Sequence, residues 1–320
     1  MEHAAPSENT GSNDQASPSV SVVIPALNEE RNLPHVFARL PAGVSQVVLV
    51  DGGSVDRTVA VARELRPDVV VVRQTRTGKG NALACGFAVC TGEVVVMIDA
   101  DGSTDPAEIP RFVGALVAGA DFVKGSRFAR GGYSHDITRL RKLGNDGLNL
   151  VVNVLFGTRF TDLCYGYNAF WRRVLPALDL PATTLPRPSD GGKLWGDGFE
   201  IETMINIRAA ATGLRVDEVG SVEHPRIHGR TNLNTFRDGF RVLRTILSEY
   251  GRARAAHRRP EATGHPAAGS GAAPAPPVPL VRRTVPVVHP VDARPPHAGH
   301  PARAARHPEI SRRYRAALDD

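Results

Sequence analysis

A strand that ends in two aspartates constrains this sequence more than any other feature. Residues 94–98 are five consecutive apolar residues, a pattern typical of a strand covered on both faces of a parallel sheet. Asp99 and Asp101 follow it at once, and Asp105 and Pro106 then have the residue types of a helix N-cap and first helical position. The two acids are therefore expected at the carboxyl end of a buried strand, where open α/β sheets bind ligands.

Two carboxylates one residue apart can point oxygen atoms at a single hard cation. Mg²⁺ and Mn²⁺ prefer oxygen ligands and often hold phosphate oxygens at the same time. Alternatively, the acids only end the strand and begin a turn. An EF-hand loop is excluded, because its sixth and twelfth positions would need Gly and Glu and hold Thr104 and Pro110. The motif also resembles the nucleophile motif of haloacid-dehalogenase-type phosphatases, with Asp99 as nucleophile, but three strand-like segments precede it instead of none.

Strand patterns alternate with helix patterns through the first half of the chain. Strands are expected at residues 19–24, 46–51, 69–72, 94–98 and 120–124. This alternation predicts an α/β fold with a doubly wound parallel sheet. Polar residues follow several of these strands, namely Asp51, Asp99, Asp101 and Arg127. Their placement predicts one ligand cleft along one edge of the sheet.

The positive charge of the chain is concentrated beyond residue 250. Residues 251–320 contain 12 arginines and 5 acidic residues, whereas residues 1–250 contain 27 basic and 28 acidic residues. The basic isoelectric point therefore gives no reason to expect a nucleic-acid partner. The same segment contains 12 of the 25 prolines and no apolar periodicity, so we predict a disordered tail.

The chain is accordingly divided into a disordered N-terminus (1–18), one catalytic domain (19–250) and the basic tail (251–320). No apolar run reaches the roughly 18 residues that a membrane-spanning helix needs. The N-terminus lacks the apolar core of a signal peptide. Three cysteines form no ligand pattern and indicate a reducing compartment, so a cytoplasmic location is expected.

Four motifs of this chain are similar to those of the family-2 glycosyltransferases of the GT-A fold. They are Pro25-Ala-Leu-Asn-Glu29, Asp51-Gly-Gly-Ser54, Asp99-Ala-Asp101 and Phe199-Glu-Ile-Glu202. Segments 125–132, 162–170 and 226–233 resemble most the polyprenyl- or dolichyl-phosphate mannosyl- and glucosyltransferases. The resemblance spans about residues 19–250. It implies a Rossmann-like, mostly parallel sheet with flanking helices, and a metal-dependent, inverting transfer of a hexose from GDP-mannose or UDP-glucose to a polyprenyl phosphate.

The resemblance also implies roles for individual residues. The metal, Mg²⁺ or Mn²⁺, would be held by Asp99, Asp101 and Ser103. The acceptor would contact Arg141 and Asn232, the latter standing where a lysine is common in the family. The nucleotide sugar would contact Pro25, Leu27, Glu29, Asp51, Asp99, Ala100, Asp101, Arg127 and Arg226.

The catalytic residues depend on the acceptor. A lipid phosphate is already ionised, whereas a hydroxyl acceptor needs a carboxylate to take its proton. Asp197, Glu200 and Glu202 stand at a helix start and are the candidate bases, although acids there also suit the helix dipole without any catalytic role. Arg127 would act in catalysis by holding phosphate charge.

Three further segments bear on the acceptor and the donor. Residues 137–156 and 235–250 have helical apolar periodicity, which suits either packing on the domain or contact with a membrane surface. Residues 180–194 are expected to form an inserted loop at the mouth of the site, and Lys79 is a candidate phosphate neighbour. The alternatives left open are a hydroxyl acceptor, the phosphatase, and a non-catalytic protein that binds sugar nucleotides.

Overall fold

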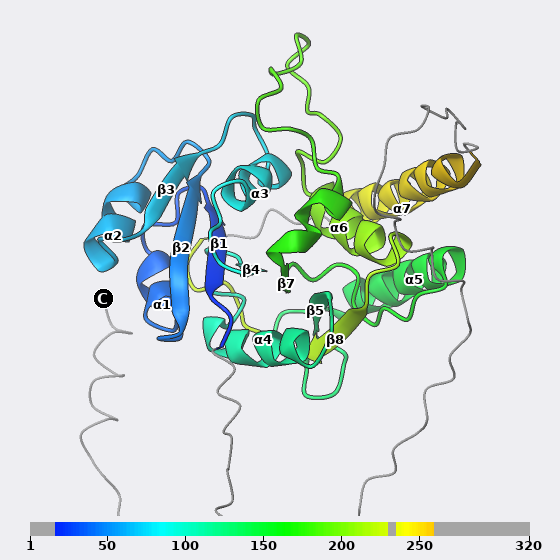
Figure 1. Cartoon of the computed structure of the whole chain (residues 1–320), viewed down its shortest axis with the longest axis horizontal. Coiled ribbons are helices and arrows are strands. Elements are labelled where there is room, and N and C mark those ends of the chain that lie inside the picture. Colours follow the sequence, from blue (N-terminus) through cyan, green and yellow to red (C-terminus); the bar gives the residue numbers. More distant parts are fainter. Residues whose placement is uncertain (1–16, 230–234, 259–320) are drawn as a thin grey trace, which may run out of the picture. The chain divides into compact units, whose positions relative to one another are not determined.

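A seven-stranded sheet forms the centre of the computed structural model, which describes residues 17–229 and 235–258 (Figure 1). The strand order is β3-β2-β1-β4-β7-β5-β8, and only β7 runs antiparallel to its neighbours. The mostly parallel sheet predicted from the sequence is confirmed. The strands are β1 (Val20–Ala26), β2 (Val44–Asp51), β3 (Val70–Arg73), β4 (Val94–Met97), β5 (Phe122–Ser126), β7 (Asn168–Trp171) and β8 (Val216–Gly220), with β6 (Tyr133–Ser134) and β9 (Val222–Glu223) forming a separate pair.

Helices cover both faces of this sheet. One face packs against α1, α2 and α4, and the other against α3 and α6. The helices are α1 (Leu33–Phe37), α2 (Thr58–Leu65), α3 (Lys79–Phe87), α4 (Ile109–Val117), α5 (Arg139–Phe156), α6 (Glu200–Ala211) and α7 (Thr235–Arg258), with 3₁₀ segments η1 (Pro106–Glu108) and η2 (Arg172–Leu178). Asp105 caps η1 as predicted, because its carboxylate accepts the Ala107 N–H at 2.9 Å.

Burial on both faces explains why the central strands have continuous apolar runs. In β4, Val94 and Val96 belong to the core beneath α4, while Val95 and Met97 belong to the core beneath α3 and α6. Successive side chains of a strand point to opposite faces, so both must be apolar when both faces are covered. The run ends at Asp99, the first polar residue after β4 ends at Met97.

A third cluster joins α5, α6 and α7. Val152, Ile207 and Ile246 form its centre, and the guanidinium of Arg208 pairs with both oxygens of buried Glu249 at 2.9 Å. Arg252 adds a further bond to Glu249 at 2.8 Å. α7 continues to Arg258, so the first eight residues of the predicted tail (251–258) are helical although apolar periodicity had already ended. The rest of the predicted tail and residues 1–16 lie outside the described residues.

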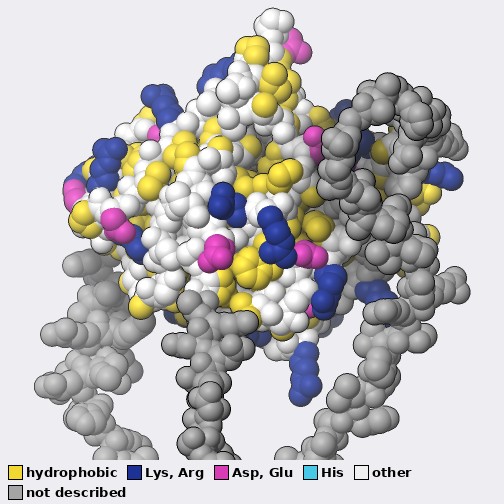
Figure 2. Space-filling view, in the orientation of Figure 1, with side chains coloured by type: hydrophobic (Ala, Val, Ile, Leu, Met, Phe, Trp, Pro, Cys, Tyr) yellow, Lys and Arg dark blue, Asp and Glu magenta, His cyan; other side chains and the backbone are white. Residues whose placement is uncertain are grey.

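The surface is mixed in character. On the face shown in Figure 2, acidic and basic side chains are interspersed with apolar ones and do not form a continuous basic area. Within the described ranges, no helix is both long enough and apolar enough to cross a bilayer.

Candidate active site

A pocket of about 340 Å³ opens at the carboxyl ends of β1, β2 and β4, and we call it the aspartate pocket. The sheet topology brings its residues together, because parallel strands end at the same edge. Asp51 stands beside it, where its carboxylate accepts the Ser54 N–H at 2.9 Å and fixes the turn at Gly52. Seven residues predicted to contact the nucleotide sugar line the pocket: Pro25, Leu27, Glu29, Asp99, Ala100, Asp101 and Arg226.

Both aspartates of the motif are paired with cations. The Lys79 ammonium lies 2.5 Å from Asp99 and also contacts Glu202. Arg226 lies 3.2 Å from Asp101 and also contacts Glu29. Burial raises the pKa of Asp99 to about 6, although the charge of Lys79 opposes that shift. Lys79 was expected as a phosphate neighbour, but here its charge is shared between two carboxylates.

The segment that carries Arg226 is bonded to the aspartate loop. The Ile227 N–H donates to the Asp101 carbonyl at 3.2 Å, and the His224 N–H donates to the Ser103 carbonyl at 2.9 Å. The Ser103 N–H in turn donates to the Asp101 carboxylate at 3.0 Å. These bonds fix both Asp101 and the arginine that faces it.

The carboxylate oxygens of the aspartate pocket suit a divalent cation that a substrate also binds. Asp99 and Asp101 supply two carboxylates, and no group of three or more His, Cys, Asp or Glu suited to a metal occurs among the residues that the structure describes. Mg²⁺ is usually bound in this way, through one or two carboxylates together with substrate phosphates and water.

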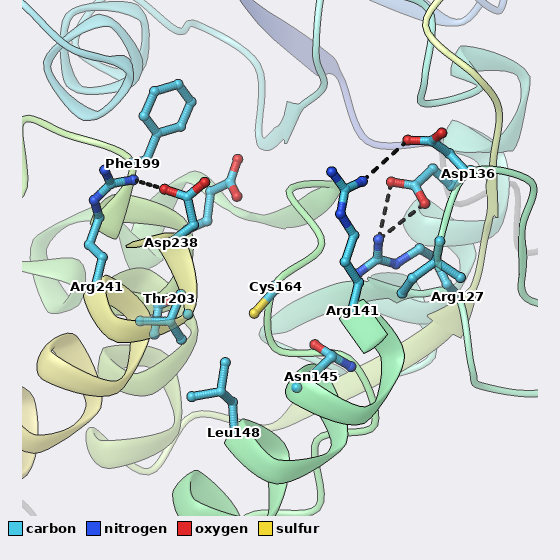
Figure 3. Close-up of a pocket in the computed structure, with 16 residues that line it drawn as sticks. Arg127, Asp136, Arg141, Asn145, Leu148, Cys164, Phe199, Thr203, Asp238 and Arg241 are labelled. Carbon is cyan, nitrogen blue, oxygen red and sulfur yellow. Dashed lines mark hydrogen bonds and ion pairs between the residues drawn. The ribbon is translucent and has the colours of Figure 1, made fainter. Parts of the chain in front are cut away.

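A second pocket of about 200 Å³ lies between α5, α6 and α7, and we call it the helix pocket (Figure 3). Figure 3 shows Arg141 and Asn145 on α5 facing Arg241 and Asp238 on α7. Phe199 lines both pockets, so the two adjoin. Apolar side chains, including Ile137, Leu148 and Val242, complete the lining.

Asn145 is the most unusual group in the helix pocket. Its side chain is about 95% buried, yet neither its amide nitrogen nor its amide oxygen has a hydrogen-bond partner. An unpaired buried amide costs free energy, and native proteins rarely keep one without a ligand or water to satisfy it. Sequence reasoning missed this residue because an asparagine within an amphipathic helix has no distinctive spacing.

The three arginines of the helix pocket are held with different strength. Arg127 donates to both oxygens of buried Asp162 at 2.7 and 2.9 Å and to Glu223 at 3.1 Å. Burial opposes the Arg127 charge, but the Asp162 and Glu223 contacts raise its pKa. Arg241 bonds Asp238 at 2.8 Å, whereas Arg141 lies 3.7 Å from Asp136. Arg141 is therefore the most loosely paired.

Arg127 differs from its prediction. It was expected to contact the nucleotide sugar, but it lines the helix pocket and nearly all its donors are engaged by Asp162 and Glu223. Arg141, predicted to contact the acceptor, does line this pocket. Asn232, the other predicted acceptor contact, lies outside the described residues.

The predicted bases Asp197 and Glu200 do not reach either pocket. Asp197 is 1% exposed and pairs with Arg76 through two bonds of 2.7 and 2.9 Å, so its carboxylate is already satisfied. Glu200 accepts the N–H groups of Gly196 and Gly198, both at 3.0 Å, and caps its own turn. Of the three acids considered, Glu202 lines the helix pocket.

The chain is similar in sequence to several known proteins. A family model described as glycosyl transferase family 2 matches residues 21–178. Glycosyltransferase AglJ of Haloferax volcanii is 32% identical over 226 residues, 69% of this chain and 68% of that protein. The polyprenol monophosphomannose synthase of Mycolicibacterium smegmatis is 39% identical over 171 residues, 50% of this chain and 64% of that protein.

One solved structure has a similar fold. Glucosyl-3-phosphoglycerate synthase from Mycobacterium tuberculosis, in complex with Mn²⁺, uridine diphosphate and glucosyl-3-phosphoglycerate, superposes with a TM-score of 0.57. The match covers 73% of this chain and 80% of that chain at 25% identity. The family match leaves no support for the phosphatase or for the non-catalytic binding protein.

The buried Arg76–Asp197 pair is expected to stabilise the fold. Asp197→Asn leaves the buried Arg76 charge uncompensated, so we expect a loss of about 3–5 kcal/mol in the free energy of unfolding. Urea denaturation measures it, with Asp190→Asn on the exposed neighbouring loop as the control. Unchanged stability combined with lost transfer activity would instead return Asp197 to a catalytic role.

Proposed function

Because the chain belongs to glycosyl transferase family 2, we propose that it moves a hexose from a nucleotide sugar, GDP-mannose or UDP-glucose, to a polyprenyl phosphate. The observation that carries the proposal is the helix pocket, where loosely paired Arg141 and unpartnered Asn145 adjoin the aspartate pocket. The relative named polyprenol monophosphomannose synthase supports the same acceptor class.

The aspartate pocket is proposed to bind the donor. A divalent cation held by Asp99 and Asp101 would offset the charge that grows on the leaving diphosphate. The negative phosphates compete with Glu29 and Asp101 for Arg226, whose planar guanidinium can make two bonds to a phosphate. Arg226 would thus exchange Glu29 and Asp101 for a phosphate without leaving the aspartate pocket.

The helix pocket is proposed to bind the acceptor phosphate. One of its oxygens forms a bond to the anomeric carbon while the bond from that carbon to the diphosphate breaks, and attack from the opposite side inverts the configuration. The acceptor is ionised beforehand, so no base has to remove a proton. Arg141 exchanges Asp136 for the phosphate at little cost, and the Asn145 amide donates to it.

Exposed apolar side chains on α5 and α7, two of the helices that line the helix pocket, are proposed to contact lipid. On α5, Leu143 is 70% exposed and Val154 is 73% exposed, and on α7 Phe240 is 70% exposed. Such side chains on helices that also carry arginines suit the surface of an anionic membrane. A peripheral position on the inner face of the cell membrane would present the acceptor directly to Arg141.

A hydroxyl acceptor on a saccharide or small metabolite is the second candidate. Glu202 favours it, because this carboxylate lines the helix pocket and contacts Lys79 of the aspartate pocket. It could take a proton from a hydroxyl placed between the pockets.

A donor panel tests the proposed function. UDP- and GDP-sugars are incubated with Mn²⁺ or Mg²⁺, with and without a short polyprenyl phosphate, and products are identified by mass spectrometry. We expect a glycosyl-phosphoprenol from one donor. Donor hydrolysis without a lipid product would support a hydroxyl acceptor, and no turnover of any donor would contradict both candidates.

Asp101→Asn tests the metal site in the same assay. Removing one of two carboxylate ligands should lower metal-dependent turnover by about 100-fold or more. The melting temperature should change little, because Asp101 lies at the pocket and not in the core. Activity within a few-fold of the wild type would refute the assignment.

Arg141→Gln tests the acceptor site. We expect the KM for polyprenyl phosphate to rise about tenfold, the effect of losing one charge-assisted contact, while the KM for the donor is unchanged. Arg139→Gln, on the exposed side of the same helix, is the matched control. An equal rise in both KM values would show that Arg141 does not act on the acceptor alone.

Leu143→Asp tests the membrane contact. Binding to vesicles that contain anionic lipid should weaken about tenfold, because a largely exposed leucine would no longer enter the interface. Leu65→Asp, at an exposed leucine of α2, is the control. Equal vesicle binding by both variants and the wild type would exclude this surface of α5.

A further inference from the structure

The loop of residues 180–194 lies between η2 and α6 (Figure 1). It contributes Lys193 to the aspartate pocket. We propose that Lys193 binds the terminal phosphate of the donor's diphosphate, the one farther from the nucleoside. The loop would thereby place a positively charged side chain beside the leaving diphosphate. The inference rests on the proposed function, because it assigns a ligand to the same pocket.

The base of the loop is fixed to the body of the domain. Arg76 donates to the carbonyls of Ala182 at 3.0 Å and Leu185 at 2.9 Å, and the Thr75 hydroxyl donates to the Thr183 carbonyl at 2.8 Å. Arg76 itself is only 2% exposed, so its guanidinium is shielded from water. The loop is therefore held by the segment that precedes α3 and does not rely on Lys193 for its position.

The end of the loop that carries Lys193 is anchored too. Trp195 follows two residues later, and its indole N–H donates to buried Glu249 at 3.0 Å. Gly191 precedes Lys193 with φ +70, a conformation that favours glycine, and a Cβ there would meet no atom within 4 Å. Lys193 thus lies on an exposed stretch between two bonded ends of the loop.

The charges of the pocket favour Lys193 as a phosphate ligand. Lys79 is shared between Asp99 and Glu202, and Arg226 is shared between Glu29 and Asp101. Among the described residues that line the aspartate pocket, Lys193 is the cation for which the structure shows no acidic partner. A phosphate can therefore recruit it without breaking an ion pair.

The residue type also matches the ligand. An ammonium on a flexible stem reaches a phosphate as a point charge and needs no fixed geometry. A nucleoside monophosphate lacks the terminal phosphate, so Lys193 should distinguish diphosphates from monophosphates. A loss of affinity for the diphosphate alone therefore indicates a contact with the terminal phosphate, whereas a general effect on the loop would weaken both ligands.

Calorimetric binding of UDP and GDP with Mn²⁺ tests the inference on the full chain. Lys193→Gln should weaken the diphosphate that the wild type binds by about tenfold, the loss of one charged hydrogen bond. The corresponding monophosphate should bind with unchanged affinity. Lys193→Arg should stay within about threefold of the wild type because it keeps the charge. Lys142→Gln, the same change at an exposed lysine of α5, should have no effect.

The outcomes separate the two proposals. If the wild type binds neither UDP nor GDP, the proposed donor site is wrong. If the wild type binds and Lys193→Gln binds equally well, only the role of Lys193 is overturned. Equal losses for the diphosphate and the monophosphate would also overturn it, because the terminal phosphate would then not be the group contacted.

Discussion

The buried pair of Arg76 and Asp197 holds together the parts of the chain that surround the aspartate pocket. The Asp197 carbonyl accepts the N–H groups of Gly80 and Asn81 at 2.8 and 3.2 Å, which places the start of α3 and hence Lys79. The Arg76 guanidinium reaches the carbonyls of the 180–194 loop. A charge is stable at this depth only when paired and fully hydrogen-bonded, so one ion pair determines where three segments meet.

The pocket holds two of its cations in ion pairs before any substrate arrives. Lys79 and Arg226 each bridge an aspartate of the motif to a glutamate, Glu202 or Glu29. Each of these cations is held by two carboxylates, so an anion that binds in the pocket has to compete with those carboxylates.

The sequence predicted the sheet and a cleft at its strand ends because both follow from local patterns. The resemblance to a family supplied the further pocket residues Pro25, Leu27, Glu29 and Arg226. The apolar run of β4 reflects burial on two faces, and motif residues at strand ends converge through topology. Contacts between residues that are distant in sequence cannot be predicted from local patterns. Local sequence predicts Asp197 as a candidate base, because its partner Arg76 is 121 residues away. β7 was missed because four residues, inserted antiparallel between β4 and β5, are specified by their neighbours.

The extended segment that contains β9 connects the two pockets. Glu223 holds Arg127 in the helix pocket, His224 bonds the carbonyl of Ser103, and Arg226 faces Asp101 in the aspartate pocket. Three residues within four consecutive positions therefore make these contacts, and Glu223 and Arg226 each line one of the two pockets. The aspartate pocket and the helix pocket are in this way joined by one short stretch of chain, which ends at a lining residue of each.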